Sequence, residues 1–246
     1  FNYLLKPDGT LSLHGFVKRH FRAPTFNERY YTDLGNALLR PEKAFQIALG
    51  AQWQHAFRRR LWQRLQLSAE VYYNKVHDKI IAYPKGQQFR WTMLNLGRVA
   101  VRGLDVNAAL EARPQRALQV ALQVRYSYQW AHDLTDPADA YYNQQIPYAP
   151  HHSGAAVVSA SFKRWACYYS FIYVGRRYAQ PENVRRNRLQ PWYTHDLCLQ
   201  RHFRLSRSLE GKLTLAVNNI FNQQYEVIAN YPMPGRTLNA ALDINF

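Results

Sequence analysis

The chain has 246 residues, 47% of them hydrophobic, which is enough apolar material for one sizeable domain and argues against disorder. Lys and Arg number 32 against 16 Asp and Glu, and the resulting net charge of +16 taken alone suggests nucleic acid. No apolar run approaches the about 20 residues of a transmembrane helix, and two cysteines, Cys167 and Cys198, are too few for a disulfide framework or a cysteine metal site.

The first residues have the pattern of the last part of a β-strand. The segment Phe1–Leu5 is followed by Lys6-Pro7-Asp8-Gly9, a sequence typical of a hairpin turn. There is no initiator Met and no basic region followed by an apolar run and a cleavage site. We therefore expect a fragment of a longer protein.

Alternation of apolar and polar residues with a period of two then runs through the whole chain and predicts β-strands. Residues 118–130 show it best, because every second side chain from Leu118 to Trp130 is apolar or aromatic. The side chains between them are polar or small and include Gln119, Gln123, Arg125 and Gln129. Ten such strands are predicted, at 10–19, 44–56, 62–78, 93–111, 117–132, 150–162, 165–176, 192–204, 210–219 and 235–246.

Strand length and loop length both favour a membrane-spanning barrel. The predicted strands exceed the usual about 5–6 residues of soluble strands and reach the about 9–11 residues that cross a bilayer. Long and short connections alternate, as in outer-membrane barrels with short periplasmic turns and longer outer loops. A soluble sandwich also alternates, with its apolar face inward. In a membrane barrel the face from Leu118 to Trp130 is expected to contact lipid instead.

Four segments, in order along the chain, resemble the TonB-dependent outer-membrane receptors. Phe21-Arg22-Ala23-Pro24 resembles the FRAP box of that family, and residues 35–43 resemble the GNPNLKPEK segment after it, with Ala37 where the family usually has Pro. Residues 95–105 resemble a family strand with two spaced glycines, Gly97 and Gly103. Residues 217–237, followed by a strand that ends in Phe246, are similar to the family's C-terminus.

This resemblance implies an all-β fold, an antiparallel transmembrane β-barrel of 22 strands filled by a plug domain. Residues 1–246 then form the C-terminal portion of the barrel, its last ten or so strands, without the plug. The implied location is the outer membrane of a Gram-negative cell. The implied partners are the TonB–ExbB–ExbD energy-transducing complex, reached through the plug, and the barrel-assembly machinery, for which Phe246 is the candidate signal.

The candidate binding surface lies in the expected outer loops, where exposed rings suit stacking against a large planar ligand. The loop candidates for ligand contact are Tyr30, Tyr31, Trp91, Tyr141, Tyr142, Arg185, Arg186 and Tyr231, together with Tyr178. Arg185, Arg186 and Arg188 stand against the single Glu182, and they fit either an anionic ligand or the phosphates of lipopolysaccharide. Arg22 and Glu28 are expected to brace the first long loop, and Arg236 to pair with a lumen carboxylate such as Asp243 or Glu70. Asp133, Asp136 and Asp139 make the loop near 133–149 acidic.

No sequence motif for catalysis or for a metal site is present, and no cofactor is expected. The neighbouring His151 and His152 are an awkward ligand pair, because adjacent strand residues point to opposite faces. Cys167 and Cys198 lie on consecutive strands, so a cross-strand disulfide and two free thiols both remain open. Haem receptors of the resembled family carry a histidine between the FRAP box and the next box, and residues 25–35 have none.

The expected function is TonB-dependent uptake of a scarce metal chelate, either cobalamin or a ferric siderophore. The spacing from the FRAP box to the last strand resembles the compact cobalamin receptors. A haem receptor, a passive porin and a barrel enzyme are the alternatives, and no enzymatic activity is expected. Nucleic acid is not an expected partner, because much of the positive charge lies in outer loops and in turns such as Arg58-Arg59-Arg60.

Overall fold

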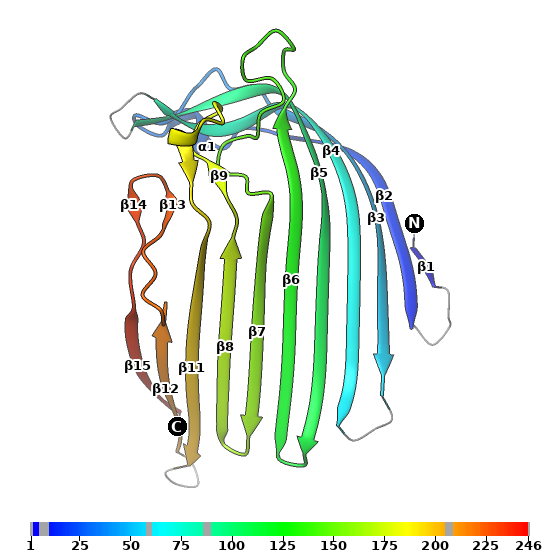
Figure 1. Ribbon diagram of the computed structural model, residues 1–246, viewed down its shortest axis with the longest axis vertical. Helices are drawn as coiled ribbons and strands as arrows, with labels where there is room; N and C mark the ends of the chain where they lie inside the picture. The colour runs from blue at the N-terminus through cyan, green and yellow to red at the C-terminus, as the bar shows by residue number, and fades with distance from the viewer. Residues whose placement is uncertain (1, 5–9, 58–60, 86–89, 205–208, 246) are drawn as a thin grey trace.

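The computed structural model describes residues 2–4, 10–57, 61–85, 90–204 and 209–245, and its main feature is one antiparallel sheet of eleven strands in chain order (Figure 1). The strands are β1 (Asn2–Leu4), β2 (Leu11–Arg22), β3 (Glu42–Ala56), β4 (Trp62–Lys85), β5 (Arg90–Gln115), β6 (Leu118–Asp133), β7 (His152–Phe162), β8 (Trp165–Val174), β11 (Trp192–Arg204), β12 (Glu210–Asn218) and β15 (Thr237–Asn245).

Smaller elements occupy the connections at the upper end of the sheet. They are α1 (Phe26–Tyr30), β9 (Arg177–Tyr178), η1 (Arg185–Asn187), β10 (Arg188–Leu189), β13 (Glu226–Ile228) and β14 (Tyr231–Pro232). No helix in the described part of the chain has the length and apolar character needed to cross a membrane.

All ten predicted strands are present, and β1 corresponds to the strand expected at the start of the chain. Consecutive strands pair throughout, and the described short turns, at residues 116–117 and 163–164, lie at the lower end in Figure 1 with the long connections at the other. The predicted all-β class with one antiparallel sheet in chain order is therefore confirmed, and the sheet is not closed into a barrel within this chain. The turn at residues 58–60 and the terminal Phe246 lie outside the described residues.

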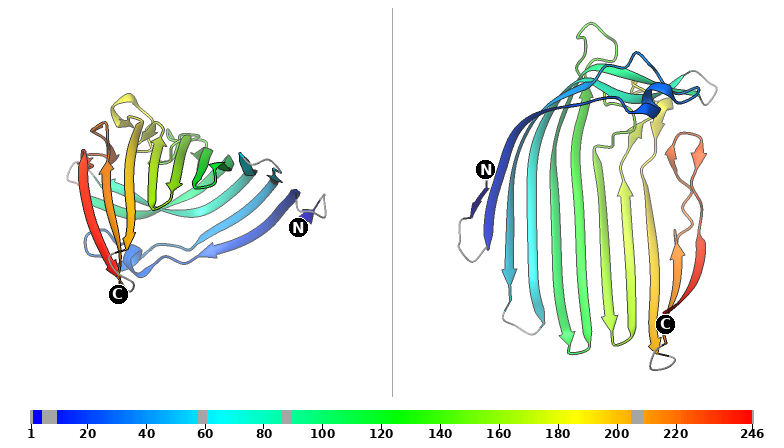
Figure 2. Two further views of the ribbon diagram at one scale, coloured as in Figure 1. Left: turned by 90° about the horizontal axis from the view of Figure 1, so that it is seen from below. Right: turned by 180° about the vertical axis from the view of Figure 1, so that it is seen from behind.

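One predicted loop is wrong. The alternation predicts a connection at residues 79–92, but β4 continues to Lys85 and β5 begins at Arg90, so Trp91 lies on a strand. The polar residues 77–79 interrupt the alternation in the sequence, whereas the pairing of β4 with β5 keeps one register across them. The extended hairpin bends over the upper end of the sheet (Figures 1 and 2).

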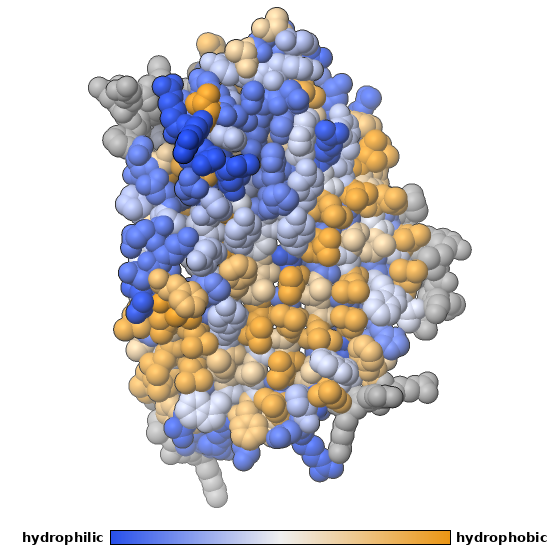
Figure 3. All heavy atoms as spheres, viewed as in Figure 1, coloured by the Kyte–Doolittle hydropathy of each residue, from blue (hydrophilic) through white to orange (hydrophobic). Residues whose placement is uncertain are grey.

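The sheet is curved into an open arc whose edges are β1 and β15 (Figure 2, left). Directly paired residues share a face, so the register places Trp53, Leu67 and Val124 in one row on the convex side. Figure 3 shows this side, with an apolar band over the middle and lower strands and polar residues above it. The two faces predicted for residues 118–130 are thus the two faces of the sheet.

The small apolar core lies at the upper end of the concave face. Val76, Val99, Val101 and Ala131 come from β4, β5 and β6, and Ile146 from the following loop packs against them. Ile146 N–H donates to the carbonyl of Ala131 at 3.0 Å, which holds the loop against β6. The core therefore anchors the long loops to the sheet.

Cys167 and Cys198 lie on neighbouring strands but on opposite faces, because Cys198 pairs with Tyr168 and Cys167 pairs with Leu199. Both thiols are free. Since a disulfide needs Cβ atoms about 3.5–4.5 Å apart on one face, oxidation of the folded protein should give no intramolecular crosslink. Thiol counting after treatment with copper phenanthroline checks this. The control is Leu199→Cys with Cys198→Ser, which places a second thiol beside Cys167 on its own face and should crosslink.

Candidate functional site

Arg22, at the upper end of β2, joins three segments of the chain. Its Nη1 donates to both carboxylate oxygens of Glu28, at 3.0 and 2.9 Å. Its Nε and Nη2 donate to the Glu42 carboxylate, each at 3.1 Å. That carboxylate also accepts from the backbone N–H of Ile80 at 2.6 Å. One guanidinium thus ties the first long loop to β3 and β4.

The helix α1 places Glu28 for this contact. Thr25 is its N-cap: the Thr25 hydroxyl accepts from Glu28 N–H at 3.2 Å, and the Glu28 carboxylate accepts from Thr25 N–H at 2.7 Å. This capping box satisfies two backbone donors that a short helix otherwise leaves free. The segment after the FRAP box therefore folds into a local structure that presents Glu28 to Arg22.

The pH dependence of this loop follows from Glu28. Partial burial raises the pKa of its carboxyl, but the hydrogen bonds from Thr25 and Arg22 together outweigh that effect and lower the pKa below its ordinary value of 4.5. A depressed carboxyl pKa stabilises the folded loop above the unfolded pKa, and this contribution is lost as the pH falls through the folded value. Hydrogen exchange of residues 23–41, corrected for intrinsic rates, should show protection at pH 6 that is lost as the pH falls below the ordinary carboxyl pKa of 4.5.

The same experiment on Arg22→Met supplies the control. Without the guanidinium the carboxyl pKa returns toward its ordinary value, so the variant should lose protection at a higher pH than the wild type. Equal exchange at both pH values in the wild-type protein would contradict the assignment.

The loops after β6 and β8 are joined by side-chain contacts. The Tyr141 hydroxyl donates to the Glu182 carboxylate at 3.1 Å, and Asn183 exchanges hydrogen bonds with the backbone of Gln145 at 2.7 and 3.0 Å. Tyr148 N–H donates to the carbonyl of Tyr178 at 2.8 Å. Glu182, three residues before Arg185, is thus engaged by a tyrosine of the other loop.

Arg177, which no sequence motif indicated, ties a third loop to these two. Only 3% of Arg177 is exposed. Its Nη2 donates to the carbonyls of Glu226 and Val227 at 2.5 and 3.0 Å, and its Nη1 reaches the carbonyl of Gln190 at 3.4 Å. A buried guanidinium held by backbone carbonyls connects β9 to β13 and fixes the loops after β8 and β12 to each other.

The predicted ring positions fall into two connected groups. Tyr30 and Tyr31 lie in and just after α1 and are 55% and 60% exposed. That loop is attached to β5 by the side-chain amide of Asn36, which donates to Met93 O at 2.9 Å. Trp91 contacts Tyr148, with ring centroids 5.7 Å apart, and so links this group to the group that contains Tyr141, Tyr142 and Tyr178.

The remaining loop candidates are exposed. Tyr231, in β14, is 50% exposed. Arg185 and Arg186 are exposed on η1, where Figure 3 shows strongly hydrophilic residues at the upper end of the convex face. Asp136 and Asp139 each accept a backbone N–H two residues on, at 2.9 Å, so these acidic residues stabilise turns of their own loop.

Arg236 is not paired with Asp243 or Glu70, the two lumen carboxylates named as its expected partners. Asp243 pairs with Lys212 at 3.0 Å, and Glu70 with His14 at 3.0 Å. Arg236 is exposed, and its backbone N–H donates to the Asn222 side chain at 2.8 Å. The length of β15 explains the difference, because Asp243 lies at the short-turn end of that strand and Arg236 precedes its loop end.

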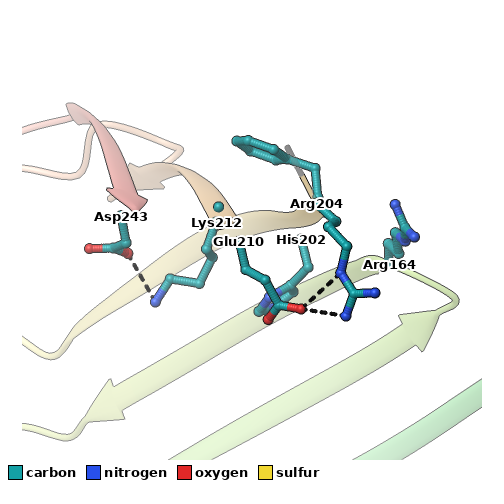
Figure 4. Close-up of a pocket in the computed structure, with 8 residues that line it drawn as sticks. Arg164, His202, Arg204, Glu210, Lys212 and Asp243 are labelled. Carbon is teal, nitrogen blue, oxygen red and sulfur yellow. Dashed lines mark hydrogen bonds and ion pairs between the residues drawn. The ribbon is translucent and has the colours of Figure 1, made fainter. Parts of the chain in front are cut away.

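Asp243 belongs to a polar pocket of about 570 Å³ at the short-turn end of the sheet (Figure 4). Lys212 points toward Asp243, and Arg204 donates twice to Glu210, at 2.8 and 3.2 Å. Arg164 and His202 complete its charged lining. Cations outnumber carboxylates here, far from the loops that carry the predicted ligand residues.

His151 does not pair with its neighbour His152. Its Nε2 lies 3.3 Å from Nε2 of His132, whose Nδ1 is 2.7 Å from the carbonyl of Asn143. Burial, and then the nearby His132, lowers the pKa of His151. His152 contacts the Tyr126 hydroxyl instead, at 2.7 Å. In the part of the chain that the structure describes, no three His, Cys, Asp or Glu side chains are grouped to hold a metal ion.

Gly103, the second glycine of the segment 95–105, is required by a close approach. A Cβ atom there would collide with the carbonyl oxygen of Tyr128 and would lie 2.5 Å from the Tyr72 hydroxyl. The ring of Tyr72 therefore crosses the backbone at Gly103 on the concave face. Two residues on, Asp105 accepts a hydrogen bond from Ser127 at 2.5 Å.

Comparison with known proteins agrees with this geometry. The family model "TonB dependent receptor-like, beta-barrel" matches residues 1–220. The vitamin B12 transporter BtuB of Photobacterium profundum is 23% identical over 233 residues, 92% of this chain and 34% of that protein. The chain thus spans about a third of the length of this relative.

Solved structures share the fold. The copper transporter OprC has a TM-score of 0.67 at 17% identity, over 96% of this chain and 37% of that one. The ferric-catecholate import receptor Fiu of E. coli K12 has a TM-score of 0.66 at 18% identity, over 99% of this chain and 34% of that one. The matching family is one of outer-membrane receptor barrels. On this fold and this match, the chain belongs to the TonB-dependent receptor family and forms part of its β-barrel.

Proposed function

We propose that the full-length protein is an outer-membrane receptor for TonB-dependent uptake of a metal chelate, with cobalamin as the first candidate and a ferric siderophore as the second. The observation that carries this proposal is the assembly of long loops at one end of the barrel, with exposed aromatic rings and arginines held on a hydrogen-bonded frame. The similarity to a vitamin B12 transporter over 92% of the chain supports cobalamin.

The frame explains how the loops would bind a large ligand. Arg22 holds the carboxylates of Glu28 and Glu42, and Arg177 holds backbone carbonyls of the other loops. Neither set of contacts involves a proposed ligand residue. The exposed residues on these loops are Tyr30, Tyr31, Tyr141, Tyr142, Arg185, Arg186 and Tyr231, and the half-buried Trp91 lies beside them. A ligand that meets a pre-ordered surface loses less conformational entropy on binding, which favours high affinity at low concentration.

The proposed partners follow from the family. Energy would come from the TonB–ExbB–ExbD complex through a plug domain, and the strand that ends in Phe246 would be read by the barrel-assembly machinery. The convex apolar band would contact lipid, and the loop arginines would contact either an anionic ligand or lipopolysaccharide. We infer that the protein transports its ligand unchanged, because the sequence has no catalytic motif and the relatives are transporters.

The test is to measure, by calorimetry, the binding of cyanocobalamin, ferric siderophores and haem to the purified full-length receptor. We expect cyanocobalamin to bind with Kd below about 1 µM. Tyr31→Ala should weaken that binding about tenfold by removing one stacked ring, whereas Tyr193→Ala, which removes an exposed ring from the convex face of β11, should leave it unchanged. Failure of all three ligands to bind below the micromolar range would rule out the metal-chelate assignment.

A further inference from the structure

A groove of about 870 Å³ lies on the convex face at the upper ends of β2, β3 and β4. Three cationic side chains and three aromatic rings alternate along it, with His77 at the top. The register arranges six of these residues in two rows across the three strands, and Tyr73 lies in the row below. The first row is Arg19, Phe45 and Lys75, and the second is Phe21, Lys43 and His77.

The cations of this groove have no acidic partner. No Asp or Glu lines the groove, and among the described residues Arg19, Lys43 and Lys75 take part in no ion pair. The nearby carboxylates are already engaged, since Glu28 and Glu42 bind Arg22 and Asp78 binds Arg40. Arg19 lies over the ring of Phe45, 5.6 Å from its centroid. Three unpaired charges beside apolar surface favour binding of an anionic group.

The surface directly below the groove is apolar. Val17 and Ile47 are paired one row below, and Leu49 and Val71 form the next row, with exposed fractions between 42% and 66%. Tyr73 pairs with Ile47 and so completes the row of Val17 and Ile47. In a barrel whose long loops face outward, this boundary lies where acyl chains meet headgroups in the outer leaflet.

We propose that this β2–β4 groove binds the lipid A headgroup of lipopolysaccharide. Arg19, Lys43 and Lys75 contact its phosphates, and Val17, Ile47, Leu49 and Val71 contact its acyl chains. Three permanent positive charges on neighbouring strands match a headgroup that carries two phosphates better than a singly charged phospholipid. This site is separate from the loop arginines, and it rests on the outer-membrane location proposed above.

The test is native mass spectrometry and titration of the detergent-purified full-length receptor with diphosphoryl lipid A. A triple variant with Arg19→Gln, Lys43→Gln and Lys75→Gln should bind lipid A about 100-fold more weakly, given the usual contribution of each basic residue near an anionic lipid surface. The matched control removes the same charge from exposed cations at the short-turn end of the sheet, by Arg116→Gln, Lys163→Gln and Arg164→Gln, and should bind lipid A as the wild type does. Heat-modifiable migration on gels verifies that both variants are folded barrels.

Other ligands identify the chemistry of the site. Monophosphoryl lipid A should bind about tenfold more weakly than the diphosphoryl form. Wild-type affinity in the groove variant, or an equal loss in the short-turn control, would overturn the proposal. Equal affinity for phosphatidylglycerol, or displacement of lipid A by millimolar inorganic phosphate, would overturn the lipid A assignment. Lipid A binding is measured in detergent, so it does not depend on ligand uptake. If the receptor binds no chelate, the proposed function is contradicted, but the lipid A measurement still tests the groove.

Discussion

Replacing Arg177 by methionine is expected to release the outer loops from one another while the strands stay intact. Methionine fills similar apolar volume but leaves the carbonyls of Glu226, Val227 and Gln190 without their donor. Loss of charge-assisted hydrogen bonds at a buried site costs about 2–3 kcal/mol, and here the cost falls on local loop opening. Trypsin should then cleave at Arg185 and Arg186 about 30-fold faster or more, since cleavage follows the open population.

The neighbouring Arg176 supplies the matched control, because it is exposed whereas Arg177 is buried. Arg176→Met should be cleaved at the wild-type rate. Arg177→Lys keeps the charge but cannot reach carbonyls on both sides at once, so an intermediate rate is expected. If Arg177→Met and Arg176→Met are cleaved equally fast, the loops are not held together by Arg177.

Replacing Arg22 by methionine is the second change with a large expected effect. It leaves the carboxylates of Glu28 and Glu42, whose side chains are only 18% and 14% exposed, without their common partner. The Arg22 side chain is itself 40% exposed, so solvent screening limits the cost to about 1–2 kcal/mol. Hydrogen exchange of residues 23–41 at pH 7 should therefore become about tenfold faster.

Lys18→Met tests whether this effect is specific, since Lys18 is an exposed cation on the same strand and the same face as Arg22. It should leave exchange in residues 23–41 unchanged. Glu42→Gln keeps an acceptor for Ile80 N–H and for Arg22, so it should cost less than Arg22→Met. Equal exchange in Lys18→Met and Arg22→Met would mean that net charge, and not the ion-pair cluster, orders the loop.

The strands were predictable because burial on a curved sheet imposes a period of two on the sequence. Residues 118–130 have that period without interruption, and the structure gives β6 as Leu118–Asp133. The prediction failed at residues 79–92, where a polar run breaks the period although backbone pairing continues from β4 to β5. Hydrogen bonds between strands are made by the backbone, so they continue through polar residues that interrupt the alternation of side chains.

The contacts among the loops were only partly predictable. Arg22 and Glu28 are six residues apart, and the motif that contains them predicts that both brace the same loop. Arg177 contacts residues 49 and 50 positions away through their backbone carbonyls. Every residue has a backbone carbonyl, so the amino-acid sequence does not indicate which of them accept these hydrogen bonds. The pairing of His151 with His132 in place of His152 has the same cause, since it depends on how the loop between them folds back on β6.

The amino-acid sequence by itself determined the fold class, the strand positions and the two faces of the sheet, because alternation along a strand is a local property. It also determined that the charge of +16 is not spread evenly, since acidic and basic residues cluster in different loops. Only the tertiary structure decided which cations are paired. Arg22 lies between two carboxylates, whereas Arg19, three residues earlier on the opposite face, lies beside Lys43 and Lys75 without a carboxylate partner. The register between strands causes this difference, because it sets which side chains become neighbours.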